Sequence, residues 1–206
     1  MSTKNILLTI VTVIVLAAVI YTLTNADDPE VYVENIEKER EKQFKFLRFN
    51  PESPLDTEQK NNLGALSFYP IDPAFKVRAR LVPAEDRKVI TIPMTDGSEE
   101  KYIKHSYAEF DLKGVPQKLL LLQSINEIDK RNFFLAFADS TSGLDTYGGG
   151  RYLNLRQDGK NSVSIDFNLA YNPYCAYNPD FACPLPPREN LMELGILAGE
   201  KDYKKE

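Results

Sequence analysis

The side chains best suited to chemistry in this chain lie between residues 137 and 190. This stretch holds both cysteines, a glycine triplet at 148–150 and a dense run of tyrosine, asparagine and aspartate residues. Arg151 stands between the triplet and Tyr152, and an arginine in such a setting suits bidentate recognition of a carboxylate or phosphate. An internal salt bridge is a second interpretation that does not exclude the first. Its candidate partners are Asp139, Asp145, Asp166 and Glu189.

Tyrosine and asparagine side chains in the same stretch predict a polar binding cleft. Aromatic faces combined with amide groups suit sugars and other polar small ligands. The predicted ligand-binding residues are Arg151, Tyr147, Asn168, Tyr171, Asn172 and Tyr174. The alternative is structural, because the Asn-Pro pairs at 172–173 and 178–179 favour turns and tyrosines pack well against prolines.

Two acids are the candidate catalytic residues, Asp139 and Glu189. A pair of carboxylates can perform general acid–base chemistry, so a hydrolase-like enzyme that combines either acid with Arg151 is an alternative function. Each acid also has an ordinary structural interpretation. Asp139 follows an apolar run and can cap the turn after it, and Glu189 can occupy the first turn of a helix. The reaction class therefore stays open.

The two cysteines, Cys175 and Cys183, close a nine-residue loop rich in proline, tyrosine and asparagine. Outside the cytoplasm such a pair predicts a disulfide, which would stabilise the fold by roughly 2.5 kcal/mol. A free dithiol is the alternative. We expect no metal and no cofactor, because the spacing is not Cys-x-x-Cys and His105 is the only histidine.

The glycine triplet could belong to a phosphate-binding loop, but the Gly-Lys-Ser/Thr signature of such loops is missing. We interpret it as a turn or bulge that lets the strand beginning at Tyr152 bend.

Length and charge narrow the class of protein. The chain has 206 residues, of which 43% are apolar and 27% charged, which is enough for one globular domain with appendages. The net charge is −5, so nucleic acid is not an expected partner, because such binding depends on cationic contacts to phosphate.

Residues 6–23 predict a transmembrane anchor. These 18 residues carry no charge and would rise about 27 Å as a helix, close to the thickness of a bilayer core. Lys4 precedes them, and Asp27 and Asp28 follow. The positive-inside rule then places residues 1–5 in the cytoplasm and the rest in the periplasm or outside the cell. A cleaved signal peptide is the alternative, although residues 24–26 are a poor cleavage site.

Residues 27–50 predict an amphipathic helical linker, and residues 51–203 a mainly β domain. Within the linker, Val33, Ile36, Phe44 and Leu47 recur at helical spacing. Asn50-Pro51 ends this helix, and a short helix through Asn62 follows, capped by Asp56 or Thr57.

The rest of the chain alternates with a period of two, which is typical of half-buried strands. Predicted strands cover 66–71, 75–82, 89–92, 101–112, 119–125, 133–138, 152–155 and 163–167. Asp-Gly turns at 96–97 and 158–159 favour hairpins. The pattern predicts an antiparallel barrel or sandwich of about eight short strands, with a short C-terminal helix over 188–197.

Several short motifs, taken together, resemble one bacterial family. They are Asp-Ser-Thr-Ser-Gly at 139–143, Thr-Tyr-Gly-Gly-Gly-Arg-Tyr at 146–152, Asp-Phe-Asn at 166–168, Tyr-Asn-Pro-Tyr-Cys-Ala-Tyr at 171–177, Cys-Pro-Leu-Pro-Pro at 183–187, Glu-Asn at 189–190 and Ala-Gly-Glu at 198–200. Ser-Pro-Leu at 53–55 and Phe-Tyr-Pro at 68–70 fit as well. Over roughly residues 35–203 the chain is similar to the family catalogued as domain of unknown function 1684. The resemblance implies a compact, mainly β domain and no established activity.

These observations favour a membrane-anchored extracytoplasmic domain that binds a polar or anionic small molecule. Its other expected partner is the membrane, through the N-terminal helix. A structural envelope protein is a third interpretation. The oligomeric state is left open.

Overall fold

The computed structural model describes residues 5, 10–16 and 28–203. The chain divides into two compact units, Met1–Glu41 and Lys42–Glu206. In the first unit, residues 10–16 are helical. Helix α2 (Pro29–Phe49) begins in the first unit and ends in the second. It corresponds to the amphipathic helix that the helical spacing of the apolar residues predicts.

No helix among the described residues is long and apolar enough to cross a membrane. Most of the predicted anchor, residues 6–9 and 17–23, lies outside the described residues, as does the predicted start of the linker at residue 27.

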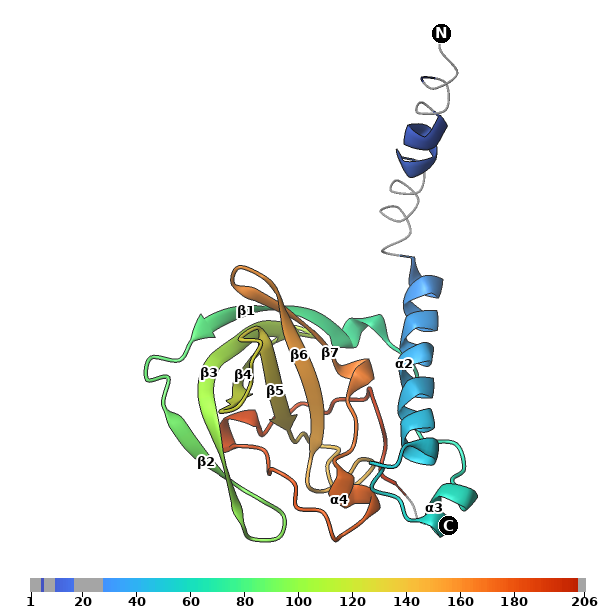
Figure 1. Cartoon of the computed structure of the whole chain (residues 1–206). Helices are drawn as coiled ribbons and strands as arrows, with labels where there is room; N and C mark the ends of the chain where they lie inside the picture. The colour runs from blue at the N-terminus through green and yellow to red at the C-terminus, as the bar shows by residue number, and fades with distance from the viewer. Residues whose placement is uncertain (1–4, 6–9, 17–27, 204–206) are drawn as a thin grey trace. The chain divides into compact units, whose positions relative to one another are not determined.

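The second unit contains a six-stranded antiparallel barrel with one additional strand (Figure 1). The strands are β1 (Lys76–Pro83), β2 (Val89–Pro93), β3 (Glu99–Leu112), β4 (Val115–Ser124), β5 (Asn132–Phe137), β6 (Arg151–Gly159) and β7 (Ser162–Asp166). Neighbours follow the order β1-β7-β6-β5-β4-β3, and pairing of β1 with β3 closes the ring. Strand β2 extends the edge of β3. The mainly β, antiparallel prediction is confirmed, and the barrel is the form adopted.

Strand β3 is long enough to pair with two strands along one of its edges. Its first part pairs with β2, and its later part, around Ala108, pairs with β1. The register against β4 shifts between Lys104 and Ser106, at His105. Such a bulge bends a strand, which allows β3 to leave β2 and close the barrel.

Alternating apolar residues fill the barrel. Ala79 and Leu81 on β1, Leu135 on β5 and Ile165 on β7 are all buried in one core cluster. A second cluster joins Leu47 of α2 to Leu55, Leu63 and Tyr177. Burying one leucine or isoleucine side chain in these clusters stabilises the fold by about 1.5–3 kcal/mol.

Short helices connect these elements. They are α3 (Thr57–Asn62), α4 (Tyr174–Tyr177) and the 3-10 helices η1 (Pro73–Phe75), η2 (Phe167–Leu169) and η3 (Arg188–Asn190). Asp56 caps α3, since its carboxylate accepts from the Gln59 amide at 2.7 Å while the Gln59 side chain accepts from the Asp56 amide.

Two predicted elements differ from the structure. The predicted strand over 66–71 is reduced to a single bridge between Phe68 and Glu200, because Pro70 removes a donor and interrupts the ladder. The predicted helix over 188–197 is also wrong beyond the three residues of η3. Its Ile196 carbonyl accepts from Arg151 instead of from a helical amide, and Met192 and Ile196 are buried in the barrel core.

Candidate functional site

Arg151 lies at the start of β6, and its side chain is fully buried. Gly150, directly before it, has a φ of +87°, and a Cβ there would stand 2.5 Å from the Phe137 carbonyl oxygen. Glycine therefore allows β6 to begin in close contact with β5. The amide of Gly150 donates to the Tyr147 carbonyl at 3.0 Å, so the triplet ends a turn, as predicted.

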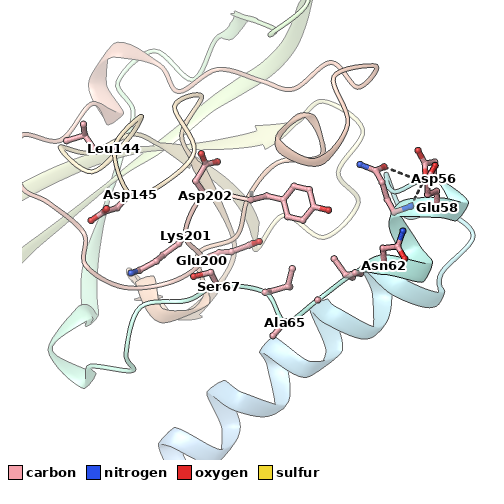
Figure 2. A pocket seen from close by; sticks show the side chains of 15 residues that line it. Asp56, Glu58, Asn62, Ala65, Ser67, Leu144, Asp145, Glu200, Lys201 and Asp202 are labelled. Carbon is pink, nitrogen blue, oxygen red and sulfur yellow. Dashed lines mark hydrogen bonds between the residues drawn. The ribbon is translucent and has the colours of Figure 1, made fainter. Parts of the chain in front are cut away.

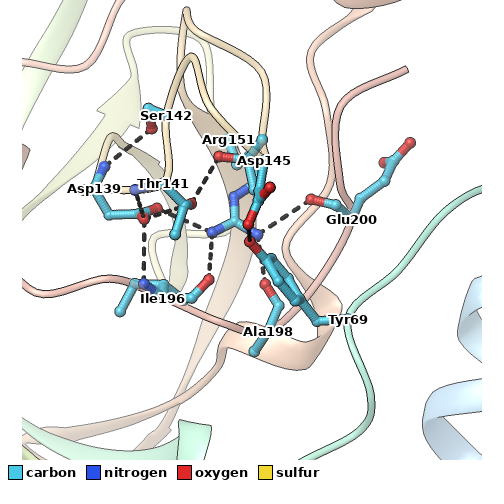
Figure 3. A network of polar contacts seen from close by, with 10 residues as sticks. Tyr69, Asp139, Thr141, Ser142, Asp145, Arg151, Ile196, Ala198 and Glu200 are labelled. Carbon is cyan, nitrogen blue, oxygen red and sulfur yellow. Dashed lines mark hydrogen bonds and ion pairs between the residues drawn. The ribbon is translucent and has the colours of Figure 1, made fainter. Parts of the chain in front are cut away.

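The Arg151 guanidinium is surrounded by acceptors of the protein itself (Figure 3). Nη2 donates to Asp139 Oδ2 at 3.0 Å and to the Ile196 carbonyl at 2.9 Å. Nη1 donates to the carbonyls of Ala198 and, at 3.2 Å, Glu200. Burial lowers the pKa of Arg151, and the Asp139 charge opposes this shift. Of the alternatives open from the sequence, the structure contains the internal salt bridge, with Asp139 as its partner.

Asp139 is as fully engaged as Arg151. Its Oδ1 accepts from the Thr141 amide at 2.9 Å, from the Thr141 hydroxyl at 2.7 Å and from the Ile196 amide at 3.2 Å. The other candidate acid, Glu189, is exposed in η3 and lies 3.7 Å from Lys104. The two candidate acids thus have different cationic partners, Arg151 and Lys104.

The remaining predicted ligand-binding residues occupy separate places. Asn168 is buried in η2 and donates to the Asp72 carbonyl at 2.8 Å. The Tyr171 hydroxyl accepts from Asn154 at 2.8 Å. Tyr174 packs against the rings of Phe46 and Phe181.

Glu200 is a second buried charged residue, and its main-chain carbonyl belongs to the Arg151 network. Its carboxylate accepts from the Tyr177 hydroxyl, from Gln43 Nε2 at 2.6 Å and from the Asn172 amide at 2.9 Å. Burial raises the pKa of Glu200, although these hydrogen bonds oppose the shift. Arg151 also donates to the Glu200 carbonyl, so the arginine helps to fix the main chain at Glu200.

A pocket of about 510 Å³ opens beside Glu200 (Figure 2). Its lining comes from three distant segments, residues 56–67 around α3, residues 144 and 145, and residues 200–203. The acidic lining residues are Asp56, Glu58, Asp145, Glu200 and Asp202, whereas Lys201 is the basic one. Its electrostatic potential therefore favours positive charge.

Hydrogen bonds connect the pocket wall formed by residues 144 and 145 to the wall formed by residues 200–203. The Asp202 amide donates to the Asp145 carbonyl at 3.0 Å. The Asp145 carboxylate accepts from the Tyr69 hydroxyl at 3.1 Å, and burial, followed by this hydrogen bond, raises the pKa of Tyr69. Lys201 Nζ lies 4.6 Å from the centre of the Tyr69 ring. Internal contacts thus hold both the acids and the lysine in place.

None of the six predicted ligand-binding residues lines this pocket. Asn172 comes nearest in the hydrogen-bond network, since it contacts Glu200 and also donates to the Lys201 carbonyl at 2.7 Å. Residues 200–203 have no local pattern that distinguishes the wall of a pocket from a charged, solvated C-terminus. The Ala-Gly-Glu motif at 198–200 was the available signal for this side of the pocket.

Both cysteines are thiols in the structure. Cys175, in α4, is half-buried, and Cys183 is buried. The Cys175 amide donates to Cys183 Sγ at 3.1 Å, and the Tyr147 hydroxyl donates to Cys175 Sγ at 3.6 Å. The disulfide stays a prediction. Among the described residues, no group of three or more His, Cys, Asp and Glu side chains is placed to hold a metal ion.

Comparison with known proteins agrees with the fold. A solution NMR structure of an uncharacterized protein from Haloarcula marismortui is 32% identical, with a TM-score of 0.66. The match covers 85% of this chain and 96% of that one. Among curated proteins there was no match. The family model described as "Protein of unknown function (DUF1684)" matches residues 61–201. The chain therefore belongs to the DUF1684 family.

Proposed function

We propose that this protein is a membrane-anchored, extracytoplasmic binding module whose pocket takes a small, positively charged polar ligand. The observation that carries the proposal is the composition of the pocket lining, in which four acids that reach solvent stand against one lysine. They are Asp56, Glu58, Asp145 and Asp202, whereas the carboxylate of the fifth acid, Glu200, is bound inside the protein. Carboxylates repel an anion and attract an amine. We therefore keep the prediction of a polar small ligand from the sequence but propose that the ligand is cationic instead of anionic.

The size and composition of the pocket fit such a ligand. About 510 Å³ is within the range of small-molecule sites. Gln59, Asn62 and Ser67 add neutral hydrogen-bonding groups to the lining, and Tyr203 adds an aromatic ring, whose face attracts a cation.

Arg151 has a positioning role in this proposal. It binds the carbonyls of Ile196, Ala198 and Glu200, so it fixes the backbone that leads into residues 200–203 of the lining. Its charge is neutralised by Asp139, which leaves the acids of the pocket to set the preference for ligand charge.

The membrane anchor rests on the N-terminal sequence. Residues 6–23 contain no charge. Within the described part of that stretch, residues 10–16 are helical, and the aliphatic side chains among them are 49–61% exposed. A helix that is apolar on all sides is typical of a membrane span.

Thermal unfolding of the full chain in detergent, with and without spermidine, tests the ligand proposal. Spermidine should raise the Tm of the wild type, because a ligand that binds only the folded state stabilises it. The double variant Asp145→Asn/Asp202→Asn should lose most of this shift. Asp180→Asn, which removes an exposed carboxylate outside the pocket, should keep it.

Two results would count against the proposal. If Asp180→Asn and the double variant lose the shift equally, spermidine is responding to net charge alone. If inorganic phosphate raises the Tm and spermidine does not, the ligand is anionic, as the sequence suggested, and the pocket is not its site.

A further inference from the structure

We propose that Cys175 and Cys183 form a thiol–disulfide exchange site that reacts with low-molecular-weight disulfides. Cys175 is the attacking thiolate in this assignment, and Cys183 is the resolving thiol. The site does not depend on the proposed ligand pocket. It assigns a redox reaction to the two cysteines, whereas a structural disulfide would only crosslink the chain.

The backbone brings the two sulfurs together. Helix α4 presents Cys175, whose amide donates to Cys183 Sγ at 3.1 Å. Cys183 is fixed from the other side by Thr95, in the hairpin after β2. Its amide donates to Thr95 Oγ1 at 3.0 Å, and its carbonyl accepts from the Thr95 amide, also at 3.0 Å. The resolving sulfur is therefore held on a rigid segment.

Exposure distinguishes the two sulfurs. Cys183 is only 4% exposed, whereas Cys175 is partly accessible and follows Tyr174, which is 37% exposed. A reagent from solvent therefore meets Cys175 first. Tyr147 supports the charge that a thiolate carries, since its hydroxyl donates to Cys175 Sγ at 3.6 Å.

The ionisation of the pair agrees with this assignment. The Cys183 thiol lowers the pKa of Cys175 to about 6, with help from the Tyr147 and Thr95 hydroxyls and against the effect of burial. The interaction with Cys175, followed by burial, raises the pKa of Cys183. The directions of the two shifts favour a thiolate on Cys175, the sulfur that solvent reaches. A thiolate is the nucleophile in disulfide exchange, and a thiol is not.

The reaction proceeds in two balanced steps. The Cys175 thiolate attacks one sulfur of RS–SR, whose S–S bond breaks, and RS⁻ leaves while Cys175–S–SR forms. Cys175 is then neutral, so its thiolate no longer raises the Cys183 pKa, and RS⁻ takes up the Cys183 proton to become RSH. The Cys183 thiolate attacks the Cys175 sulfur, the mixed-disulfide bond breaks, and the second RS group leaves as RS⁻. The two cysteines are oxidised, and one disulfide is reduced to two thiol equivalents.

Oxidised glutathione is the probe for the test, with intact-mass spectrometry as the readout. The reduced wild type should form the internal disulfide, losing two hydrogens and retaining no glutathione. The Cys183→Ser variant should stop with one glutathione on Cys175. The Cys175→Ser variant should react at least about tenfold more slowly, because its remaining thiol, Cys183, is buried.

A second measurement needs no variant. Peptide mapping of the wild type after brief iodoacetamide treatment should find Cys175 modified well before Cys183. Equal modification of both, or a stable glutathione adduct on the wild type, would overturn the assignment. A pair that stays fully oxidised at every ratio of reduced to oxidised glutathione would instead be a fixed structural disulfide.

Discussion

At the residue scale, Arg151 shows how burial determines the role of a charged group. The feature that suggested ligand binding was an arginine among glycines and tyrosines, and the same feature allows complete burial. Glycine removes the side chain that would separate β6 from β5, and the guanidinium then binds Asp139 and the carbonyls of Ile196, Ala198 and Glu200. A sequence shows that an arginine is present, but three of these four acceptors are main-chain atoms that residue types do not reveal.

Replacing Arg151 should therefore lower the stability of the folded protein. Arg151→Met leaves the Asp139 carboxylate buried without its cation, which should reduce the free energy of unfolding by about 3–5 kcal/mol. Urea unfolding followed by circular dichroism measures this loss. Arg156→Met is the matched control on the same strand, because its ion pair with Asp129 is exposed and should contribute less than about 1 kcal/mol. Similar losses for both variants would contradict a structural role for Arg151.

At the element scale, the strands were the most predictable part of the chain and the C-terminal segment the least. Strand β1 alternates Val77, Ala79 and Leu81 with charged residues, and this local pattern alone indicates a strand with one buried face. The segment after residue 188 has helical composition, but its side chains complete the barrel core and its carbonyls bind Arg151. Such tertiary contacts override local preference and leave no local signal.

Asn190 is an example of such a tertiary contact, because its side chain supplies hydrogen bonds where β4 and β5 pair over only a short length. The register of these strands contains only the pair Leu122 and Phe134. Nearby, the fully buried Asn190 side chain accepts from the Leu120 amide at 2.6 Å and donates to the carbonyls of Leu120 and Ala136 at 2.9 Å and 2.8 Å. One side chain thus takes the place of several ladder hydrogen bonds.

Asn190→Leu should destabilise the barrel by about 2–4 kcal/mol, because it leaves buried main-chain groups without partners at about 1–3 kcal/mol each. Thermal and urea unfolding give the size of the loss, and amide hydrogen exchange at Leu120 should accelerate. Asn126→Leu, an exposed position in the loop after β4, is the control and should change stability by less than about 0.5 kcal/mol. If exchange at Leu120 is unchanged, the side chain does not hold these strands.

At the scale of the whole molecule, sequence patterns gave the fold class but not the pocket. The antiparallel barrel follows from alternating strands joined by turn residues, and a bulge at His105 allows β3 to close it against β1. The pocket depends on residues 56–67, 144–145 and 200–203 meeting in space. No local pattern pairs three such distant segments, so the prediction favoured the conspicuous stretch between residues 137 and 190.

The N-terminal segment makes a prediction about where the whole molecule resides. Ile14→Lys places a charge near the middle of residues 6–23, where a lysine costs about 2.5–3.5 kcal/mol of insertion free energy. The double variant Val13→Lys/Ile14→Lys should therefore move the protein from the membrane pellet to the supernatant after alkaline carbonate extraction. Ile128→Lys, which adds the same charge at a body position that is 93% exposed, should leave the protein in the pellet. A wild type that is itself extracted by carbonate would contradict the anchor and favour the cleaved signal peptide, which also exports the domain.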